Sequence, residues 1–433
     1  MEKTKVALIG MGTVGAGVAR LLLDYGDRTA RHAGRTLWLE KAVVRDLDKP
    51  RDGVDLPEGI LTTDLAEITG NPEIKAVAQL IGGLEPARTI MLQLLESGKD
   101  VVTANKALLA EHGPELFDRA RELGRTIAFE ASVAGGVPII APLGQCLTAN
   151  QIESIHAILN GTSNFILDEM ETRDQSYDDA VAEAQRLGYA EADPAMDVDG
   201  TDAAQKLAIL AHLAFGARVR WEDVPRRGID SVNPIDIRNA KELGYRIKLL
   251  ATAKLVSEGL ELHVSPTLVP LGTPLAEVHG AYNALGVVGD AVGSVFFHGL
   301  GAGQMPTASA VVSDLIDVVV GRAAITFRSL KLWSQEEPRV FARDYDAVSS
   351  RYYMRFNVED RPGVLARLAG ELGEQQVSIA SVIQHETPDR QNGMTPLVIM
   401  THCVPEGAAR RAFEGINRLD CVRGRSVRLK VRD

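Results

Sequence analysis

The chain has 433 residues, which is enough for about three domains that each bury a hydrophobic core. Its formal net charge of −11 argues against non-specific nucleic-acid binding, which needs clustered Lys and Arg side chains. The chain starts with a strand pattern instead of a cleavable leader, and no apolar run approaches the roughly 18 residues of a membrane span. Three scattered cysteines predict neither a disulfide framework nor a zinc site, which favours a reducing compartment. Together these features lead us to expect a cytoplasmic protein without a membrane partner.

Residues 1–131 alternate short β-branched runs with helical patterns, which is typical of βαβ units in a parallel sheet. The expected strands lie at 6–9, 39–44, 76–81, 100–103 and 126–129. The expected helices lie at 14–23, 86–96 and 115–123. This order predicts an α/β fold with a Rossmann-type, dinucleotide-binding domain over 1–131.

A glycine-rich turn follows the first expected strand directly and opens the first expected helix. It reads GMGTVG and contains Gly10, Gly12, Thr13, Val14 and Gly15. The glycines permit a tight turn and a close approach of the backbone to a pyrophosphate, while the helix N-terminus supplies free N–H groups. Because strand, turn and helix agree, we favour dinucleotide binding over a turn that is merely tight.

The end of the second strand bears on the choice of cofactor. A carboxylate there would hold the ribose hydroxyls of NAD, whereas an arginine accommodates the 2′-phosphate of NADP. The chain has Arg45 next to Asp46, followed by Lys49 and Arg51, which favours NADP(H) and leaves NAD(H) as the alternative. An ordinary basic turn would also explain Lys49 and Arg51.

Two later loops complete the expected cofactor site. Each leaves the carboxyl end of a strand, where open α/β sheets bind their ligands. These loops contain Gly82, Gly83, Thr103 and Lys106.

The middle and end of the chain follow other patterns. Residues 132–305 are mixed, with a helix at 203–215, and 306–333 predict a helix that returns to the nucleotide-binding domain. Residues 334–350 are polar and aperiodic and predict a linker. From 351 to 433 a further unit begins with a strand, a turn, a helix and a second strand, a βαβ start.

An acidic loop over 188–206, GYAEADPAMDVDGTDAAQK, runs directly into the helix at 203–215. Crowded carboxylates repel one another, so they indicate a cation, a cationic ligand or a proton. The alternative is a solvated loop in which Asp199 or Thr201 caps the next helix.

Several long motifs resemble homoserine dehydrogenases over about the first 340 residues. They are ANK at 104–106, EASVAGGVPII at 130–140, NGTSNFIL at 160–167, GYAEADPAMDVDGTDAAQKLAIL at 188–210 and GAGQMPTASAVVSD at 301–314. The resemblance implies an α+β substrate-binding and dimerisation domain over 132–305. It also places Gly303 at the cofactor.

Residues 355–384 resemble the start of an ACT domain, a small ferredoxin-like βαββαβ module that commonly binds amino acids at dimer interfaces. In this family the module implies feedback by threonine or a related product. The alternative is a module that only mediates oligomerisation, since fold analogy carries function poorly. A homodimer or a homotetramer is expected.

The family reaction is reversible hydride transfer between a nicotinamide and L-aspartate 4-semialdehyde, giving L-homoserine on the route to threonine, methionine and isoleucine. Negative charge develops on the aldehyde oxygen, which needs a proton donor or a cation. The resemblance singles out Lys206 as acid and base, Asp202 as the group that fixes its position, and Lys106 as a second cation. A surface ion pair between Asp202 and Lys206, and a cofactor phosphate contact by Lys106, are the alternatives.

The resemblance also implies the remaining ligands. Glu191 is expected to hold the substrate ammonium group, because a zwitterion needs a counter-charge. The other substrate contacts are expected from Asp197, Asp202, Tyr189, Gly161 and Thr162. Asp193 and Asp199 are interpreted as loop and cap residues.

A monovalent cation, Na⁺ or K⁺, is expected near the domain junction, held mainly by backbone carbonyls. Its ligands are expected at Glu130, Val133, Gly135 and Val137. Without the resemblance, a glycine-rich turn before Pro138 explains this segment.

Two other functions remain open at this point. One is another NAD(P)-dependent amino-acid dehydrogenase. The other is a catalytically silent amino-acid sensor, which the presence of Lys106, Glu191, Asp202 and Lys206 disfavours.

Overall fold

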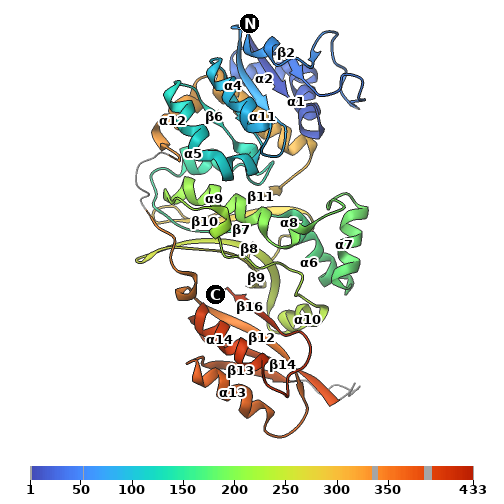
Figure 1. The fold of residues 1–433 in the computed structure, drawn as a ribbon, viewed down its shortest axis with the longest axis vertical. Coiled ribbons are helices and arrows are strands. Elements are labelled where there is room, and N and C mark those ends of the chain that lie inside the picture. The colour runs from blue at the N-terminus through green and yellow to red at the C-terminus, as the bar shows by residue number, and fades with distance from the viewer. Residues whose placement is uncertain (1, 52, 334–339, 385–392, 433) are drawn as a thin grey trace. The chain divides into compact units, whose positions relative to one another are not determined.

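The computed structural model describes residues 2–51, 53–333, 340–384 and 393–432, which form two compact units (Figure 1). Unit 1 contains Met1–Ile155, Ala204–Asp223 and Tyr282–Phe341. Unit 2 contains His156–Ala203, Val224–Ala281 and Ala342–Asp433. No helix within the described ranges is long and apolar enough to cross a membrane.

A six-stranded parallel sheet organises unit 1, in the order β3-β2-β1-β4-β5-β6. The strands are β1 (Lys3–Ile9), β2 (Thr36–Val43), β3 (Leu61–Thr62), β4 (Ile74–Gln79), β5 (Asp100–Thr103) and β6 (Ile127–Ala128). The strand order reverses between β1 and β4, which is where such sheets bind dinucleotides. All five expected strands are present, and only the two-residue β3 was too short to predict.

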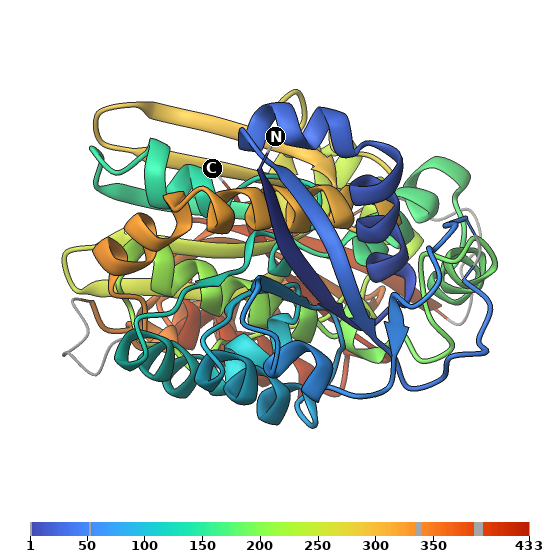
Figure 2. The same cartoon turned by 90° about the horizontal axis from the view of Figure 1, so that it is seen from above.

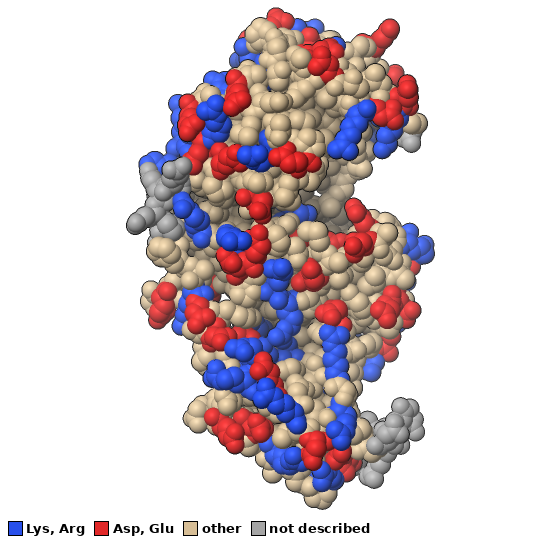
Figure 3. Space-filling model, viewed as in Figure 1, with Lys and Arg blue, Asp and Glu red and all other residues tan. Residues whose placement is uncertain are grey.

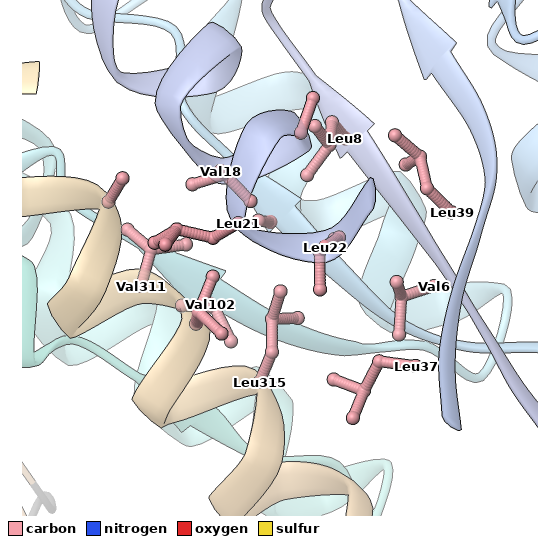
Figure 4. Packing of buried hydrophobic residues seen from close by; sticks show 14 of the residues in the cluster. Val6, Leu8, Val18, Leu21, Leu22, Leu37, Leu39, Val102, Val311 and Leu315 are labelled. Carbon is pink, nitrogen blue, oxygen red and sulfur yellow. The ribbon is translucent and has the colours of Figure 1, made fainter. Parts of the chain in front are cut away.

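Helices of unit 1 cover this sheet, and two of them come from far along the chain (Figure 2). They are α1 (Thr13–Asp24), α2 (Gly26–Ala33), α3 (Ala66–Thr69), α4 (Ala87–Glu96), α5 (Lys106–Glu122), α11 (Gln304–Val319) and α12 (Arg322–Leu330). Helices α1 and α11 pack closely, because a Cβ on Gly17 would lie 2.9 Å from the Cβ of Ala308. Val18, Leu22 and Leu315 join the strands in one core (Figure 4), each contributing about 1.5–3 kcal/mol by burial.

Two helices differ from the expected ranges. Helix α5 begins at Lys106, not at residue 115, and Pro114 lies inside it. The proline hid the first half of the helix, because a proline usually marks a helix start or a break. The single helix expected over 306–333 is two helices, separated where Gly321 adopts a φ of 86°, in the left-handed region that favours glycine.

Unit 2 is built around a long antiparallel hairpin of β8 (Tyr245–Val256) and β9 (Gly259–Pro270). The helices α6 (Gly161–Arg173), α7 (Tyr177–Arg186), α8 (Ala195–Val198) and α10 (Pro234–Glu242) belong to the same unit. Strand β7 (Ile152–Ile158) and helix α9 (Thr201–Phe215) contribute residues to both units. In unit 1, β10 (Tyr282–Gly289) and β11 (Gly293–Leu300) form a second antiparallel pair.

The C-terminal module has the expected βαββαβ order. It consists of β12 (Ser349–Glu359), α13 (Val364–Glu374), β13 (Ile379–Gln384), β14 (Met394–Thr401), the short β15 (Val404–Pro405), α14 (Glu406–Asn417) and β16 (Val427–Val431). Its sheet order, β16-β12-β14-β13, is antiparallel and ferredoxin-like. Of the expected linker, 334–339 lie outside the described residues, and a short 3-10 helix occupies Tyr345–Ala347.

The C-terminal module and the hairpin form one mixed sheet within unit 2. Strand β16 runs parallel to β9, with Lys430 opposite Thr267. Buried charges join the C-terminal module to α10 as well: the Arg355 guanidinium contacts the Asp236 carboxylate at 2.6 Å, and the Tyr353 hydroxyl donates to that carboxylate at 2.9 Å. The side chain of Asp236 is fully buried, and that of Arg355 is 4% exposed.

A second buried cluster lies inside the module itself. Burial raises the pKa of Glu406, but the charges of Arg428 and Lys430 outweigh this effect and lower it to about 2. The Tyr352 hydroxyl donates to Glu406 at 2.7 Å. These ion pairs are buried, so removing one partner leaves an uncompensated charge.

Candidate functional site

The glycine turn between β1 and α1 has the geometry that a pyrophosphate requires. Gly10 adopts a φ of 99°, and a Cβ on Gly15 would lie 2.2 Å from the Gly10 carbonyl oxygen. A Cβ on Gly12 would meet no described atom within 4 Å, so the space beside this residue is open. Gly10 therefore makes the tight turn, Gly12 leaves room for a ligand, and Gly15 permits the close packing of turn and helix. Thr13 and Val14 begin α1, where backbone N–H groups face the turn.

The basic residues in the loop after β2 differ in what their side chains contact. Arg45 is exposed and lies two residues after the end of β2. The Arg51 guanidinium donates to the carbonyl oxygens of Lys49 at 2.7 Å and Leu47 at 3.2 Å, which folds it onto its own loop. Arg45 is therefore the better candidate for a 2′-phosphate contact.

The loops after β4 and β5 are joined by one asparagine. The Asn105 amide donates to the carbonyl oxygens of Ile81 at 3.1 Å and Gly83 at 2.7 Å, while its oxygen caps α5 by accepting from Leu108 N–H. The backbone of Gly83 has a φ of 77°, and a Cβ on Gly82 would meet no described atom within 4 Å. This arrangement presents open backbone at the carboxyl ends of the strands.

Thr103, Lys106 and Gly303 occupy defined positions in unit 1. The Thr103 hydroxyl is fully buried and donates to the Gln79 side chain at 3.0 Å, so its side chain serves the loop itself. Lys106 is the first residue of α5 and is half-buried. Gly303 adopts a φ of 124° at the N-terminus of α11, a backbone conformation that favours glycine.

Lys206 differs from its neighbours in the first three turns of α9. Every other residue over 201–212 is buried, whereas Lys206 is half-buried. A lysine is costly in such a helix unless its ammonium group reaches water or a partner. Asp202, 3% exposed, lies four residues earlier and so projects from the same face of the helix.

The acidic loop is held by the first turn of α6. The Asn160 amide nitrogen donates to Asp197 Oδ1 at 2.7 Å and to Asp202 Oδ2 at 2.9 Å. The Thr162 hydroxyl donates to the Tyr189 carbonyl at 2.7 Å, and the Ser163 hydroxyl donates to the Asp197 carbonyl at 2.7 Å. The structure thus brings Gly161, Thr162, Tyr189, Asp197 and Asp202 into one place in unit 2.

Sequence reasoning missed Asn160, although its motif was noticed. The available signal was an asparagine directly before a helix, which is typical of an N-cap. Its two carboxylate partners are remote in the sequence, so no local pattern reveals them.

Glu191 lies on the exposed part of the acidic loop, and the Tyr189 ring lies 4.8 Å from the Phe165 ring. The carboxylates of Asp193 and Asp199 accept from the backbone N–H groups of Ala195 and Thr201, two residues ahead of each. These local bonds occupy one oxygen of each carboxylate, as the interpretation of Asp193 and Asp199 as loop and cap residues predicts. Only part of the acidic loop is therefore available for a ligand.

A buried lysine of β8, Lys248, is hydrogen-bonded to α6. The Lys248 ammonium group donates to the Asn164 side-chain oxygen at 3.0 Å and to the Val278 carbonyl. Burial lowers the pKa of Lys248 to about 8, although the Asp168 carboxylate opposes this shift. These bonds tie α6 to β8 and to the loop before β10.

The segment expected to hold a monovalent cation is a tight turn in unit 1. The Glu130 carboxylate accepts from the backbone N–H groups of Ile139, Ile140 and Ala141 at 2.6–2.8 Å, so the side chain is committed to the backbone. Two consecutive left-handed residues, Ala134 and Gly135, bend the chain between Val133 and Val137. Backbone carbonyls, and not this carboxylate, are therefore the suitable cation ligands.

Asp314 of α11 stands beside this turn and accepts from the Glu130 backbone N–H at 2.8 Å. Removal from water, together with the Glu130 carboxylate, raises the pKa of Asp314 well above its usual value. Among the residues that the structure describes, no group of three or more His, Cys, Asp or Glu side chains is arranged to hold a metal ion.

Family models match three segments of the chain. They are the homoserine dehydrogenase NAD-binding domain over residues 10–130, the homoserine dehydrogenase domain over 138–316 and the ACT domain over 352–417. The homoserine dehydrogenase of Pseudomonas aeruginosa is 43% identical over 444 residues, which cover 100% of this chain and 99% of the relative.

Solved structures agree with these matches. The homoserine dehydrogenase of Thiobacillus denitrificans is 43% identical with a TM-score of 0.91, covering 100% of this chain and 99% of that chain. A hyperthermophilic archaeal homoserine dehydrogenase, solved in complex with NADPH, is 27% identical with a TM-score of 0.62, covering 74% of this chain and 98% of that one. The open turn at Gly12, the acidic loop held by α6 and the full-length similarity lead to one conclusion: the chain belongs to the homoserine dehydrogenase family of NAD(P)-dependent oxidoreductases and carries its C-terminal ACT domain.

Proposed function

We propose that this chain reduces L-aspartate 4-semialdehyde to L-homoserine reversibly, with NADPH as the preferred hydride donor and Lys206 as the acid and base. The observation that carries the assignment is the position of Lys206, the half-buried lysine of an otherwise buried stretch of α9. When bound, the nicotinamide supplies the hydride. The chain's own task is to place the substrate and to move one proton.

Lys206 would deliver that proton from its ammonium group to the aldehyde oxygen as negative charge develops there, and take it back in the oxidation direction. Asp202 would fix the lysine from one helical turn away. Lys106, at the start of α5, would supply a second positive charge for orienting the aldehyde.

The substrate is a zwitterion and needs a negative partner for its ammonium group. We assign this role to Glu191, whose carboxylate lies on the exposed part of the acidic loop. Asp197 would assist, while Tyr189, Gly161 and Thr162 would line the same pocket.

Glu191→Gln is therefore expected to raise the KM for homoserine by about tenfold or more, because a hydrogen bond to a charged group contributes about 1.5–3 kcal/mol. The kcat should change less, and the KM for the nucleotide should stay near wild type. Steady-state kinetics check both. Asp193→Asn in the same loop is the matched control, and an unaltered homoserine KM in Glu191→Gln would remove Glu191 from the ammonium site.

NADPH preference is proposed from Arg45, which is exposed two residues after the end of β2. An NADPH complex of a relative supports the proposal. Arg45→Ala is expected to lower kcat/KM for NADPH about ten- to hundredfold while that for NADH changes little, since only NADPH has the 2′-phosphate. Lys49→Ala is the control in the same loop. Equal losses with both nucleotides would contradict a 2′-phosphate contact.

A monovalent cation, Na⁺ or K⁺, is proposed at the turn of Glu130, Val133, Gly135 and Val137, with the backbone carbonyls as ligands. Replacing both ions with choline tests whether activity depends on them.

We further propose that the ACT domain senses threonine or a related amino acid and that the chain works as a homodimer or homotetramer in the cytoplasm. Its three cysteines are free thiols, which suits a reducing compartment. Acidic and basic side chains are interspersed over the face shown in Figure 3, which favours a small ligand over nucleic acid as the partner. Inhibition assays with threonine and size measurement in solution test these points.

A further inference from the structure

Asn160 joins β7 to α6 and is 5% exposed. Its side-chain oxygen caps α6 by accepting from the Ser163 N–H at 2.7 Å. Its amide nitrogen donates to Asp197 Oδ1 at 2.7 Å and to Asp202 Oδ2 at 2.9 Å. Both N–H bonds of the amide are therefore directed at carboxylates, and the side chain is fixed at both ends.

This arrangement solves an electrostatic problem. Two carboxylates that contact the same nitrogen atom lie close together and repel each other. An amide donates to both without adding a charge of its own, whereas a lysine or an arginine would add one. The Asn160 amide therefore offsets part of the repulsion between the two carboxylates. It also sets which oxygen of each carboxylate points toward Asn160: Oδ1 of Asp197 and Oδ2 of Asp202.

The surrounding bonds make the first turn of α6 a fixed support for the acidic loop. Thr162 and Ser163 hold the backbone of Tyr189 and Asp197. Asn164, in the same helical turn, donates to the Val278 carbonyl at 3.1 Å and to the Gly280 carbonyl at 2.8 Å. Asn160 adds the only two bonds of this set that end on the carboxylates themselves.

We infer that Asn160 is a positioning residue for the reaction, because it orients the carboxylates of Asp197 and Asp202 as a pair. The inference rests on the proposed roles of Asp202 and Lys206. Asp202 lies one turn before Lys206 on α9, so a rotated Asp202 carboxylate would misalign the group that moves the proton.

The test uses two substitutions that both preserve the helix cap. Asn160→Asp is nearly isosteric, and aspartate caps a helix as well as asparagine does. It replaces the donor with a third carboxylate. Asn160→Ser keeps a capping oxygen and removes the two amide N–H donors without adding charge; a hydroxyl that accepts at the cap has a single O–H, so it cannot donate to both carboxylates. Ser163→Ala is the control, because it removes a bond of the same turn that does not reach either carboxylate.

Asn160→Asp is expected to lower kcat for homoserine oxidation by about 10² or more, and Asn160→Ser by about tenfold. The loss in Asn160→Asp should shrink as the pH falls and one carboxyl of the three takes up a proton, whereas the loss in Asn160→Ser should not. The dissociation constant of NADPH should stay near wild type in both, and Ser163→Ala should stay within about threefold of wild type in kcat.

Asp202→Asn separates the inference from the roles on which it rests. If Asp202→Asn is impaired while Asn160→Asp and Asn160→Ser keep wild-type kcat, the inference about Asn160 is overturned and the role of Asp202 stands. If all three keep wild-type kcat, the proposed roles of the acidic loop are wrong. A loss in Asn160→Ser without a change in thermal unfolding supports positioning even if Asn160→Asp fails to fold.

Discussion

Lys206→Met is expected to lower kcat for homoserine oxidation by at least about 10², because acid and base assistance contributes about 10²–10⁴ to such a step. Methionine fills the space of the lysine stem in a stretch of α9 that is otherwise buried, so the fold should persist. Single-turnover measurement of NADPH formation reports the hydride step directly. The dissociation constant of NADPH, followed by its fluorescence, should remain near wild type.

Lys206→Arg separates charge from proton transfer. Arginine keeps the positive charge but does not release a proton near neutral pH, so kcat should stay low while the KM for homoserine stays closer to wild type. An unchanged kcat in Lys206→Met would place the acid elsewhere. Lys106→Met would then be the next variant to measure.

Asp236→Ala is expected to destabilise the protein by about 3–5 kcal/mol, since it leaves the buried Arg355 guanidinium without its counter-charge. The Asp236 carboxylate also accepts from the Tyr353 hydroxyl at 2.9 Å and from the Asn233 backbone N–H at 3.0 Å, where it completes the cap of α10. Urea unfolding measures the loss as a lower transition midpoint.

Asp230→Ala is the matched control for this effect. Asp230 contacts Arg425 at 2.8 Å, but both side chains are more than half exposed, so the loss should stay below about 1 kcal/mol. Adding Arg355→Met to Asp236→Ala removes the orphaned charge and should recover part of the stability. Similar midpoints for Asp230→Ala and Asp236→Ala would show that the buried pair contributes no more than a surface pair.

The nucleotide end of the fold is predictable because its signals are local. The glycines at 10, 12 and 15 adjoin a strand and a helix, and each has the environment that its place in the motif implies. Helix α5 begins where the Asn105 side chain caps it by accepting from the Leu108 N–H. The sequence does not predict this early start, because Pro114 interrupts the helical pattern. Local sequence describes propensity, and here a cap and tertiary packing decided the boundary.

The acidic loop shows the opposite case. Its charge was visible, but the amide that organises it belongs to another helix, and the hydrogen bonds join residues that are far apart in sequence. The pairing of β16 with β9 is similarly invisible, because strand partners depend on register across the whole unit. The resemblance to a family predicts which residues of the loop act, and the structure adds the neighbours that hold them.

The parallel pairing of β16 with β9 has a practical consequence for protein engineering. A chain that ends at residue 345 would lose β16 and uncover the β9 edge, whose backbone groups then become a template for aggregation. It would also leave Asp236 buried without Arg355. Variants that change the effector response proposed for the ACT domain should therefore be point substitutions inside that domain, because it shares one sheet with the β8–β9 hairpin.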